Sequence, residues 1–308
     1  MLRYIQRRLL IAIPVILGVA TIVFALMHLL PGDPAEVMLA QSGGQADAIA
    51  RLRSQLGLDL PLHVQYWRFL TGIVRGNFGE SIWLRKPVSQ VLGEQLPATL
   101  ELAGAAMILA VLVGVALGLL AALKHNSWID RAAMAFSVVG VSMPIFWSSL
   151  LGIYLFAAKL RWLPATGQGD FRHLILPAAI LGYGAAGSIA RIVRSSMLEV
   201  LGQGYITVAH SKGLFRRVVL LRHALRNALI PVVTMSGLQF GALMGGAVIT
   251  ETVFSRQGLG RTMVDAIIWK DFPLVQGGVM LIAGIYILVN LLVDVSYGLI
   301  DPRIRYGQ

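Results

Sequence analysis

Long apolar runs without charge constrain this chain more than any other feature of its sequence. A bilayer core about 30 Å thick needs about 20 apolar residues of helix to cross it. The runs that meet this requirement occupy approximately residues 9–30, 102–123, 132–158, 174–190, 229–249 and 279–300. The sequence therefore predicts an all-α polytopic membrane protein with six transmembrane helices.

The composition agrees with a chain whose main solvent is lipid. It is 56% hydrophobic and 13% charged, with a mean hydropathy of +0.73, whereas soluble proteins are about 45–50% apolar and about 25% charged. These values exclude a disordered, collagenous or nucleic-acid-coating protein. The chain has no cysteine, which excludes a disulfide framework, a thiolate nucleophile, an iron–sulfur cluster and a thiolate zinc site.

The net charge of +11 is distributed unevenly between the two faces that six spans define. One face, with both termini and the loops 124–131 and 191–226, carries 14 basic and three acidic residues, against 12 basic and 11 acidic residues on the other. The positive-inside rule then places both termini in the cytoplasm. Membrane topology explains this basicity better than nucleic-acid binding, because no aromatic-interleaved basic platform accompanies it.

The apolar runs also divide the chain into segments. We expect a cytoplasmic N-terminus and first span at 1–30, an extracytoplasmic helical segment at 31–96, and a cytoplasmic tail at 301–308. Residues 97–300 form a five-helix membrane core that includes a cytoplasmic loop at 195–228. Within the extracytoplasmic segment, residues 46–56 and 61–74 space their apolar side chains at helical intervals.

No set of residues predicts catalysis or metal binding. The chain lacks a Gly-x-x-x-x-Gly-Lys-Ser/Thr loop for nucleotide phosphates, and its histidines lack the i, i+4 spacing of a helical metal site. The string Gly167–Asp170 has the Gly/Asp chemistry of a turn and lies in an expected outside loop. Ionisable residues are scarce within the spans, which disfavours the rival hypothesis of a channel or proton-coupled secondary transporter.

Small residues in two spans predict close helix packing. Gly237, Gly241 and Gly245 recur every four residues in the fifth run, and Gly114 and Gly118 have the same relation in the second. Small residues at this spacing let helix backbones approach closely in membranes. We therefore expect the fifth span to present a packing stripe, and the second to pack within the chain.

Polar residues within the spans indicate where a translocation path lies. Ser236 and Gln239 in the fifth span border either water or a packed neighbour, and the sequence leaves both roles open. In the third run, Ser142 and Met143 precede Pro144, which breaks the helix at membrane depth. The backbone carbonyl freed by this break needs protein or water nearby. Ser142, Met143, Ser236 and Gln239 are the candidate path residues.

The segment before the fifth span is the most informative part of the chain. A short helix from Val208 to Lys212 is expected to end at Gly213 as a left-handed cap. A basic amphipathic helix follows, with an apolar side formed by Val218, Leu221, Leu225 and Leu229. Attraction to anionic lipid would explain the basic helix, but it leaves the short helix and its glycine stop unexplained.

Several strings along the chain resemble one transporter family. They lie at 7–9, 30–34, 55–59, 76–79, 221–233, 245–248, 251–254, 258–261 and 301–306. Together they resemble, almost end to end, the first permease subunit of ATP-binding-cassette (ABC) importers of the dipeptide/oligopeptide/nickel group. The resemblance implies the type I importer transmembrane-domain fold. The chain departs from the family at Ser255-Arg256-Gln257, where the family often has Trp-Pro.

The resemblance also implies a contact with an ATPase subunit. In the family, a Glu-Ala-Ala, three residues, Gly pattern forms a coupling helix that inserts into a groove of the ATPase. Here the pattern begins Thr207-Val208-Ala209 and ends at Gly213, so the family's Glu is replaced by Thr207. The implied contact residues are Tyr205, Thr207, Val208, Ala209, His210, Ser211, Lys212, Gly213, Leu214 and Arg217.

As a member of this family, the chain would form half of a path for short peptides delivered by a substrate-binding protein. Nickel complexes, glutathione or another small solute are alternative cargoes. The implied partners are a homologous second permease, two cytoplasmic ATPase subunits that bind ATP and Mg, the external binding protein and membrane lipid, with no nucleic acid. The chain itself would perform no catalysis and hold no cofactor. The implied location is the bacterial inner membrane, with both termini cytoplasmic.

Overall fold

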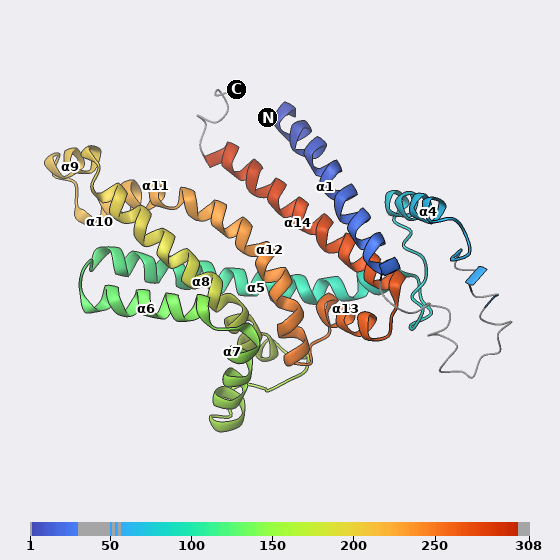
Figure 1. The fold of residues 1–308 in the computed structure, drawn as a ribbon. Coiled ribbons are helices and arrows are strands. Elements are labelled where there is room, and N and C mark those ends of the chain that lie inside the picture. Colours follow the sequence, from blue (N-terminus) through green and yellow to red (C-terminus); the bar gives the residue numbers. More distant parts are fainter. Residues whose placement is uncertain (1, 30–49, 51–52, 55–56, 301–308) are drawn as a thin grey trace. The chain divides into compact units, whose positions relative to one another are not determined.

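The computed structural model describes residues 2–29, 50, 53–54 and 57–300, and this part of the chain is predominantly helical (Figure 1). Two of its segments, η1 and η2, are π-helices. In chain order the elements are α1 (Leu2–Leu29), α4 (Leu62–Arg75), α5 (Val88–Leu123), α6 (Trp128–Ser142), α7 (Ile145–Gly152), η1 (Ile153–Lys159), α8 (Arg172–Leu201), α9 (Gly204–Ser211), α10 (Arg216–Val218), η2 (Val219–Leu225), α11 (Arg226–Ala228), α12 (Ile230–Val253), α13 (Leu259–Ile268) and α14 (Phe272–Ile300).

The helices of the described residues provide five or six of the predicted spans. Five of them, α1, α5, α8, α12 and α14, are long and apolar enough to cross a membrane. The number is six if one bent pair counts as a span, in which α6 and the continuous α7–η1 segment meet at 110°. The bend falls at the predicted break, because Met143 is extended (φ −78°, ψ 128°) and Pro144 precedes the next helix without an N–H to donate.

The predicted boundaries of two spans were wrong. Helix α5 begins at Val88 rather than near residue 102, and α8 continues to Leu201 rather than ending near residue 190. Charged residues that suggested loops lie inside these helices. Arg194 in α8 does not end the helix, because its guanidinium is paired with Asp130, 2.6 Å away.

Acidic residues are also more frequent within the long helices than the sequence suggested. Glu101 lies in α5, Asp130 in α6 and Glu251 in α12, and the last two are buried. The sequence placed them at loop positions or span edges, where they entered only the charge count. Their partners in the folded chain allow charged residues to lie within helices. A search for runs without charge therefore underestimates the length of these helices.

The chain divides into two compact units. The first contains Thr99–Arg256 and the end of α14 from residue 289. In its core, α5 and α6 pack on adjoining faces of α8 with very small separations. A Cβ added at Gly118 of α5 would lie 2.5 Å from the backbone oxygen of Ala190 in α8, and one at Gly187 of α8 would meet the backbone oxygen of Ser137 in α6. The predicted contact of the second span within the chain is therefore confirmed.

The second unit contains Leu2–Ala98 and Gln257–Leu288. Its core joins the first turns of α5 to α13 and the start of α14, through Val88, Val91, Leu92, Leu259, Met263, Ala266, Leu274 and Val275. The fully buried Asp271 caps α14 by accepting from the Leu274 N–H (3.2 Å), and it also accepts from the Ser81 hydroxyl (2.5 Å). An aspartate at this position satisfies a free N–H of the first helical turn.

Of the two helices expected in the 31–96 segment, one is confirmed. Helix α4, Leu62–Arg75, occupies the predicted range 61–74 and contacts α1, where the Tyr66 hydroxyl lies 2.7 Å from that of Thr21. The predicted helix at 46–56 lies mostly outside the described residues, as does the tail 301–308. The division into functional segments at 1–30, 31–96, 97–300 and 301–308 stays a prediction.

Candidate functional site

Helix α9 forms the short helix that the sequence placed before the fifth span. It begins at Gly204, earlier than the predicted Val208, and ends at Ser211. Gly213 has a φ of +76°. Its N–H donates to the His210 carbonyl (2.9 Å), and the Leu214 N–H donates to the Ala209 carbonyl (3.4 Å). This pair of bonds is a Schellman motif, so the predicted glycine cap is confirmed.

One face of α9 packs on the chain and the other is exposed. Ile206 and Ala209 belong to the core cluster of the first unit, and Ala209 is only 8% exposed. The Asn227 amide donates to the Tyr205 hydroxyl (2.8 Å), which ties α9 to α11. The other predicted contact residues are exposed: Tyr205, Thr207, Val208, His210, Ser211, Lys212, Gly213, Leu214 and Arg217.

Ala209 differs from the other predicted contact residues because it is buried within the chain. Its methyl group belongs to the chain's own core, since it lies three positions after Ile206 and both residues project from the same face of α9. Phe215, which the sequence did not select, is 82% exposed just after the Schellman motif. The exposed surface of α9 and the turn after it consists of residues 205, 207–208 and 210–217. We name it the coupling face after the contact that the sequence predicts for it.

The predicted apolar side of the following helix was wrong by part of a turn. Val219, Ala224 and Ala228 are buried, whereas Val218 and Leu221 are 38% and 57% exposed. The cause is η2, Val219–Leu225, which forms a π-helix. A π-helix closes i→i+5 hydrogen bonds and so advances fewer degrees per residue than an α-helix. A constant 3.6-residue period therefore assigns the wrong face here, although Leu225 and Leu229 still pack partly on the core.

Two predicted path residues line the same hollow in the first unit. This space of about 310 Å³ lies among the α6–α7 break, α8 and α12, and we name it the polar hollow for its serine, tyrosine and glutamine side chains, although most of its lining is apolar. Met143 from the break and Gln239 from α12 both line it, together with Ser148, Tyr183 and Ser188. Among the described residues the Gln239 amide has no hydrogen-bond partner. The hollow therefore offers a free amide to a polar solute or to water.

The other two predicted path residues do not line this hollow. The Ser236 hydroxyl donates to the Val232 carbonyl of its own helix (2.8 Å), which satisfies it locally. Ser142 is exposed at the end of α6 and is not part of the lining. The sequence could not rank polar residues that lie within one turn of each other, and their part in a translocation path stays a prediction.

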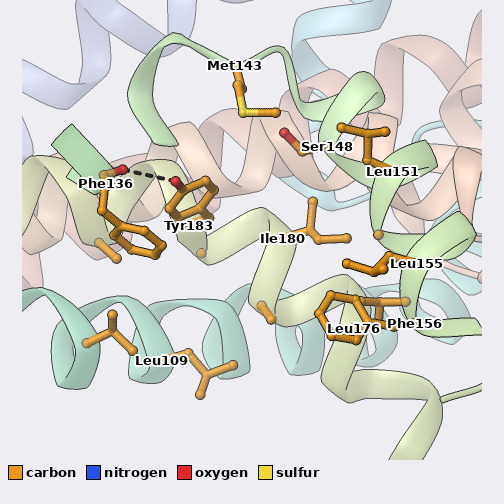
Figure 2. Close-up of a pocket in the computed structure, with 15 residues that line it drawn as sticks. Leu109, Phe136, Met143, Ser148, Leu151, Leu155, Phe156, Leu176, Ile180 and Tyr183 are labelled. Atoms are coloured by element: carbon orange, nitrogen blue, oxygen red, sulfur yellow. Dashed lines mark hydrogen bonds between the residues drawn. The ribbon is translucent and has the colours of Figure 1, made fainter. Parts of the chain in front are cut away.

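A second cavity of about 550 Å³ lies beside the polar hollow and is almost wholly apolar (Figure 2). Leucine, isoleucine and phenylalanine side chains from α5, α6, α7, η1 and α8 surround it, and Tyr183 and Met143 line both spaces. The Tyr183 hydroxyl donates to the Phe136 carbonyl (2.9 Å), as Figure 2 shows. Because this hydroxyl is already bonded, the cavity suits apolar contents and not a charged solute.

The glycine stripe of α12 packs only in part as predicted. Gly237 is buried against Val293 of α14, where an added Cβ would clash with the valine side chain. Gly245 is exposed and has no atom within 4 Å of an added Cβ. Its neighbour Gly246 packs instead, against Ile145 and Leu181 at 2.9 Å. Gly241 is half-buried. The four-residue repeat therefore drifts away from the packed face as α12 turns.

The partners of two buried acidic residues were missed by sequence reasoning. Asp130 is bound by Arg194 on α8. The Thr99 hydroxyl donates to the fully buried Glu251 (2.6 Å). A charged residue beside an apolar run needs a partner if it is buried, because burying an unpaired charge is costly. The partner of each residue lies far along the chain, so it could not be identified without the fold.

The 160–171 turn confirms the turn interpretation of the Gly167–Asp170 string. Gly167 has a φ of +97°, and Asp170 is solvent-exposed and lies 2.9 Å from the His173 ring. The hydrogen bond from His173 lowers the pKa of the Asp170 carboxyl below its ordinary value. No group of three or more potential metal-ligating residues occurs in the described part of the chain.

Comparison with solved structures identifies the fold. The structure of the MetNI methionine ABC transporter in inward-facing conformations matches with a TM-score of 0.57 at 19% identity, over 69% of this chain and 97% of that one. An amino acid ABC transporter crystallised with histidines matches with a TM-score of 0.52 at 18% identity, over 70% and 94% of the two chains. The chain thus has the type I fold of ABC importer permeases.

The sequence comparisons define the family. Residues 114–306 match the binding-protein-dependent transport system inner membrane component, and residues 1–103 match the corresponding N-terminal membrane component. The chain belongs to this family and is a permease subunit of an ABC importer in the inner membrane. This membership sets aside the alternative of a self-sufficient channel or secondary transporter.

Relatives named for their transport function match along nearly the whole chain. The glutathione transport system permease protein GsiC is 47% identical in Salmonella paratyphi A and 44% in Escherichia coli K12, over 99% of this chain and 100% of each relative. The dipeptide transport system permease protein DppB of Alkalihalophilus pseudofirmus is 43% identical over the same shares. The expected resemblance to peptide importer permeases is confirmed.

Proposed function

We propose that this permease forms half of a translocation path for short peptides that a substrate-binding protein delivers. The observation that carries this proposal is end-to-end identity of 43–47% with permeases named for dipeptides and for glutathione, which is itself a tripeptide. Uptake of a labelled dipeptide by cells with and without the gene, with competition by glutathione and by a nickel complex, tests it. If removal of the gene abolishes uptake of the nickel complex but not of the dipeptide, the cargo is the nickel complex and not a peptide.

The proposed complex contains this chain, a homologous second permease, two cytoplasmic ATPase subunits and an external substrate-binding protein. The family description, a binding-protein-dependent inner membrane component, supports the binding protein. This chain has no phosphate-binding loop, so the ATPase subunits would bind ATP and Mg and carry out hydrolysis. The permease then contributes no covalent chemistry, and its described residues need no cofactor.

The coupling face of α9 is the proposed contact with an ATPase subunit. It combines exposed apolar groups, Val208 at 54% and Phe215 at 82%, with the basic Lys212 and Arg217. Exposed apolar groups on a short, firmly anchored helix are typical of a surface that a partner covers. Closure of the ATPase subunits would displace α9, and rigid helix packing would convert this displacement into alternating access.

The polar hollow is the proposed part of the path within this chain, with Met143 and Gln239 facing the solute. The Ser142 and Ser236 positions border it along the same helices. A free amide suits the polar backbone of a peptide because it can both donate and accept hydrogen bonds. The selectivity for one peptide over another would lie largely in the binding protein.

Replacing Gln239 with leucine is expected to reduce transport severalfold while the complex still assembles. The change removes the unbonded amide from the hollow and keeps a side chain of similar volume. A matched control is Ser236→Ala on the same helix, where the lost hydroxyl bonded only its own backbone. Uptake assays beside co-purification of the ATPase subunits measure both effects. Normal transport by the Gln239→Leu complex would place the path elsewhere.

The proposed orientation places the coupling face in the cytoplasm and the 160–171 turn outside. Single cysteines introduced into this cysteine-free chain test it. In intact cells, a Gln168→Cys variant is expected to react with a membrane-impermeant thiol reagent, whereas a Ser211→Cys variant reacts only after the membrane is opened. Labelling of the Ser211→Cys variant in intact cells would contradict six spans with cytoplasmic termini.

A further inference from the structure

One buried ion pair connects two elements that the sequence does not relate. Asp130, near the start of α6, has a side chain only 5% exposed. The Arg194 guanidinium of α8 binds it with both arms, Nε to Oδ1 at 2.6 Å and Nη2 to Oδ2 at 2.8 Å. A bidentate arginine–carboxylate pair fixes orientation as well as distance. The pair therefore fixes the start of α6 relative to one turn of α8.

The same carboxylate organises the hairpin that joins α5 to α6. The Asn126 N–H donates to Asp130 Oδ2 (3.0 Å), and Asn126 has a φ of +61°. Ser127 is the N-cap of α6, and its hydroxyl accepts from the Asp130 N–H (3.4 Å). His125 Nδ1 lies 3.2 Å from Arg194 Nη2. The 124–127 hairpin thus closes around Asp130, and Arg194 holds this closed hairpin.

Helix α8 links this pair to the coupling face. It ends at Leu201, and α9 begins at Gly204 after a short turn. The last turns of α8 and the buried face of α9 belong to one core cluster, which includes Met197, Val200, Ile206 and Ala209. Figure 1 shows α9 and the α5–α6 hairpin toward the same end of the first unit. A force on α9 can therefore reach Arg194 through the short turn, the shared core cluster and the last turns of α8.

We propose that the Asp130–Arg194 pair is a positioning element that makes the α5–α6 hairpin move with α9 during the transport cycle. The inference rests on the proposed contact between α9 and the ATPase. Gly118 holds α5 against Val193, the residue before Arg194, and Gly187 holds α6 on α8 two turns earlier. To this helix packing the ion pair adds a link with fixed orientation between α8 and the hairpin, where the displacement would enter the permease.

The chain offers a matched control on the same helix. Arg191 is an exposed arginine of α8 and has no hydrogen-bond or ion-pair partner among the described residues. Replacing either arginine with glutamine removes the same charge from the same helix. A difference between the Arg191→Gln and Arg194→Gln variants therefore reports the pair with Asp130 and not the charge of this region.

The test uses the whole importer, with its ATPase subunits and binding protein, reconstituted in liposomes. We expect Arg194→Gln and Asp130→Asn to lower the amount of peptide transported per ATP by about 2- to 30-fold, the range for mutations that modulate coupling. Arg191→Gln is expected to leave the ratio unchanged. Arg194→Lys is expected to give an intermediate ratio, because lysine keeps the positive charge but cannot form the bidentate contact of a guanidinium. An unchanged ratio in assembled Arg194→Gln importer overturns the inference.

Two further measurements separate this inference from the proposed function. Cross-linking from a Val208→Cys variant to the ATPase reports the α9 contact alone, and its absence in an otherwise native importer would reject that contact. Spin labels at Trp128 and Glu199, both exposed, report the distance between the hairpin and α8. We expect this distance to stay constant between nucleotide-free and ATP-bound importer. A change of distance overturns the inference even if the Arg194→Gln importer does not assemble.

Discussion

Replacing Gly213 with valine is expected to lower substrate-stimulated ATP hydrolysis by about tenfold or more, while the permease still inserts into the membrane. Gly213 has a φ of +76° and ends α9 with a Schellman motif. The left-handed conformation costs a residue with a Cβ about 1–2 kcal/mol, and a β-branched side chain is disfavoured further. Valine therefore forces the turn after α9 out of this conformation and displaces Leu214 and Phe215 on the coupling face.

Two control variants make the cause visible. Gly213→Asn is expected to keep most activity, because asparagine tolerates the left-handed conformation. Gly204→Ala at the other end of α9 is expected to be tolerated, because this glycine has no positive φ and no atom lies within 4 Å of an added Cβ. ATPase assays of the reconstituted importer measure all three variants. Normal stimulated hydrolysis by the Gly213→Val complex would place the coupling contact elsewhere on the chain.

The sequence predicted what lipid and backbone chemistry determine locally. Apolar runs located the membrane-crossing helices, because a bilayer demands length and apolarity of each segment by itself. Pro144 located the bend between α6 and α7, and Gly213 located the end of α9, because each residue restricts or permits one backbone conformation. These signals depend on neighbouring residues only, so a single sequence is sufficient to find them.

Features set by distant contacts could not be predicted in the same way. Helix α8 continues past Arg194 because Asp130 compensates its charge from another helix. The π-helix of Val219–Leu225 moves the buried face to Val219 and Ala224, and nothing in the apolar period of this segment shows it. Likewise Gly246 packs rather than Gly245, because Ile145 and Leu181 approach α12 from one direction only.

The candidate site shows the same division. The short helix α9 and its glycine cap were predicted, because these signals are contiguous in sequence, and its contact with an ATPase stays a prediction. Of the four predicted path residues, Met143 and Gln239 line one hollow, which exists only after α6, α8 and α12 have packed, and the path itself also stays a prediction. Ser236 has the same polarity as Gln239 in the sequence, but its hydroxyl bonds the backbone one turn away. A polar residue within a span thus indicates that its helix has a polar surface, but only the tertiary structure shows which residue of that helix lines the hollow.

Replacing Gly118 with leucine is expected to prevent assembly of a stable permease. An added Cβ there would lie 2.5 Å from the Ala190 backbone oxygen and 2.6 Å from the Val193 Cβ. Backbone atoms cannot rotate away, so α5 must separate from α8, and overpacking of this kind costs at least about 1–3 kcal/mol.

Gly104 of the same helix is the matched control, because no atom lies within 4 Å of an added Cβ at that position. A Gly104→Leu variant is therefore expected to assemble normally. Thermal melting of the detergent-purified importer, together with recovery of the ATPase subunits on the permease, compares the two variants. Equal melting temperatures would contradict the close contact of α5 with α8. That contact also underlies the transmission of α9 displacement, so a weakened Gly118→Ala importer that still assembles is expected to transport less peptide per ATP.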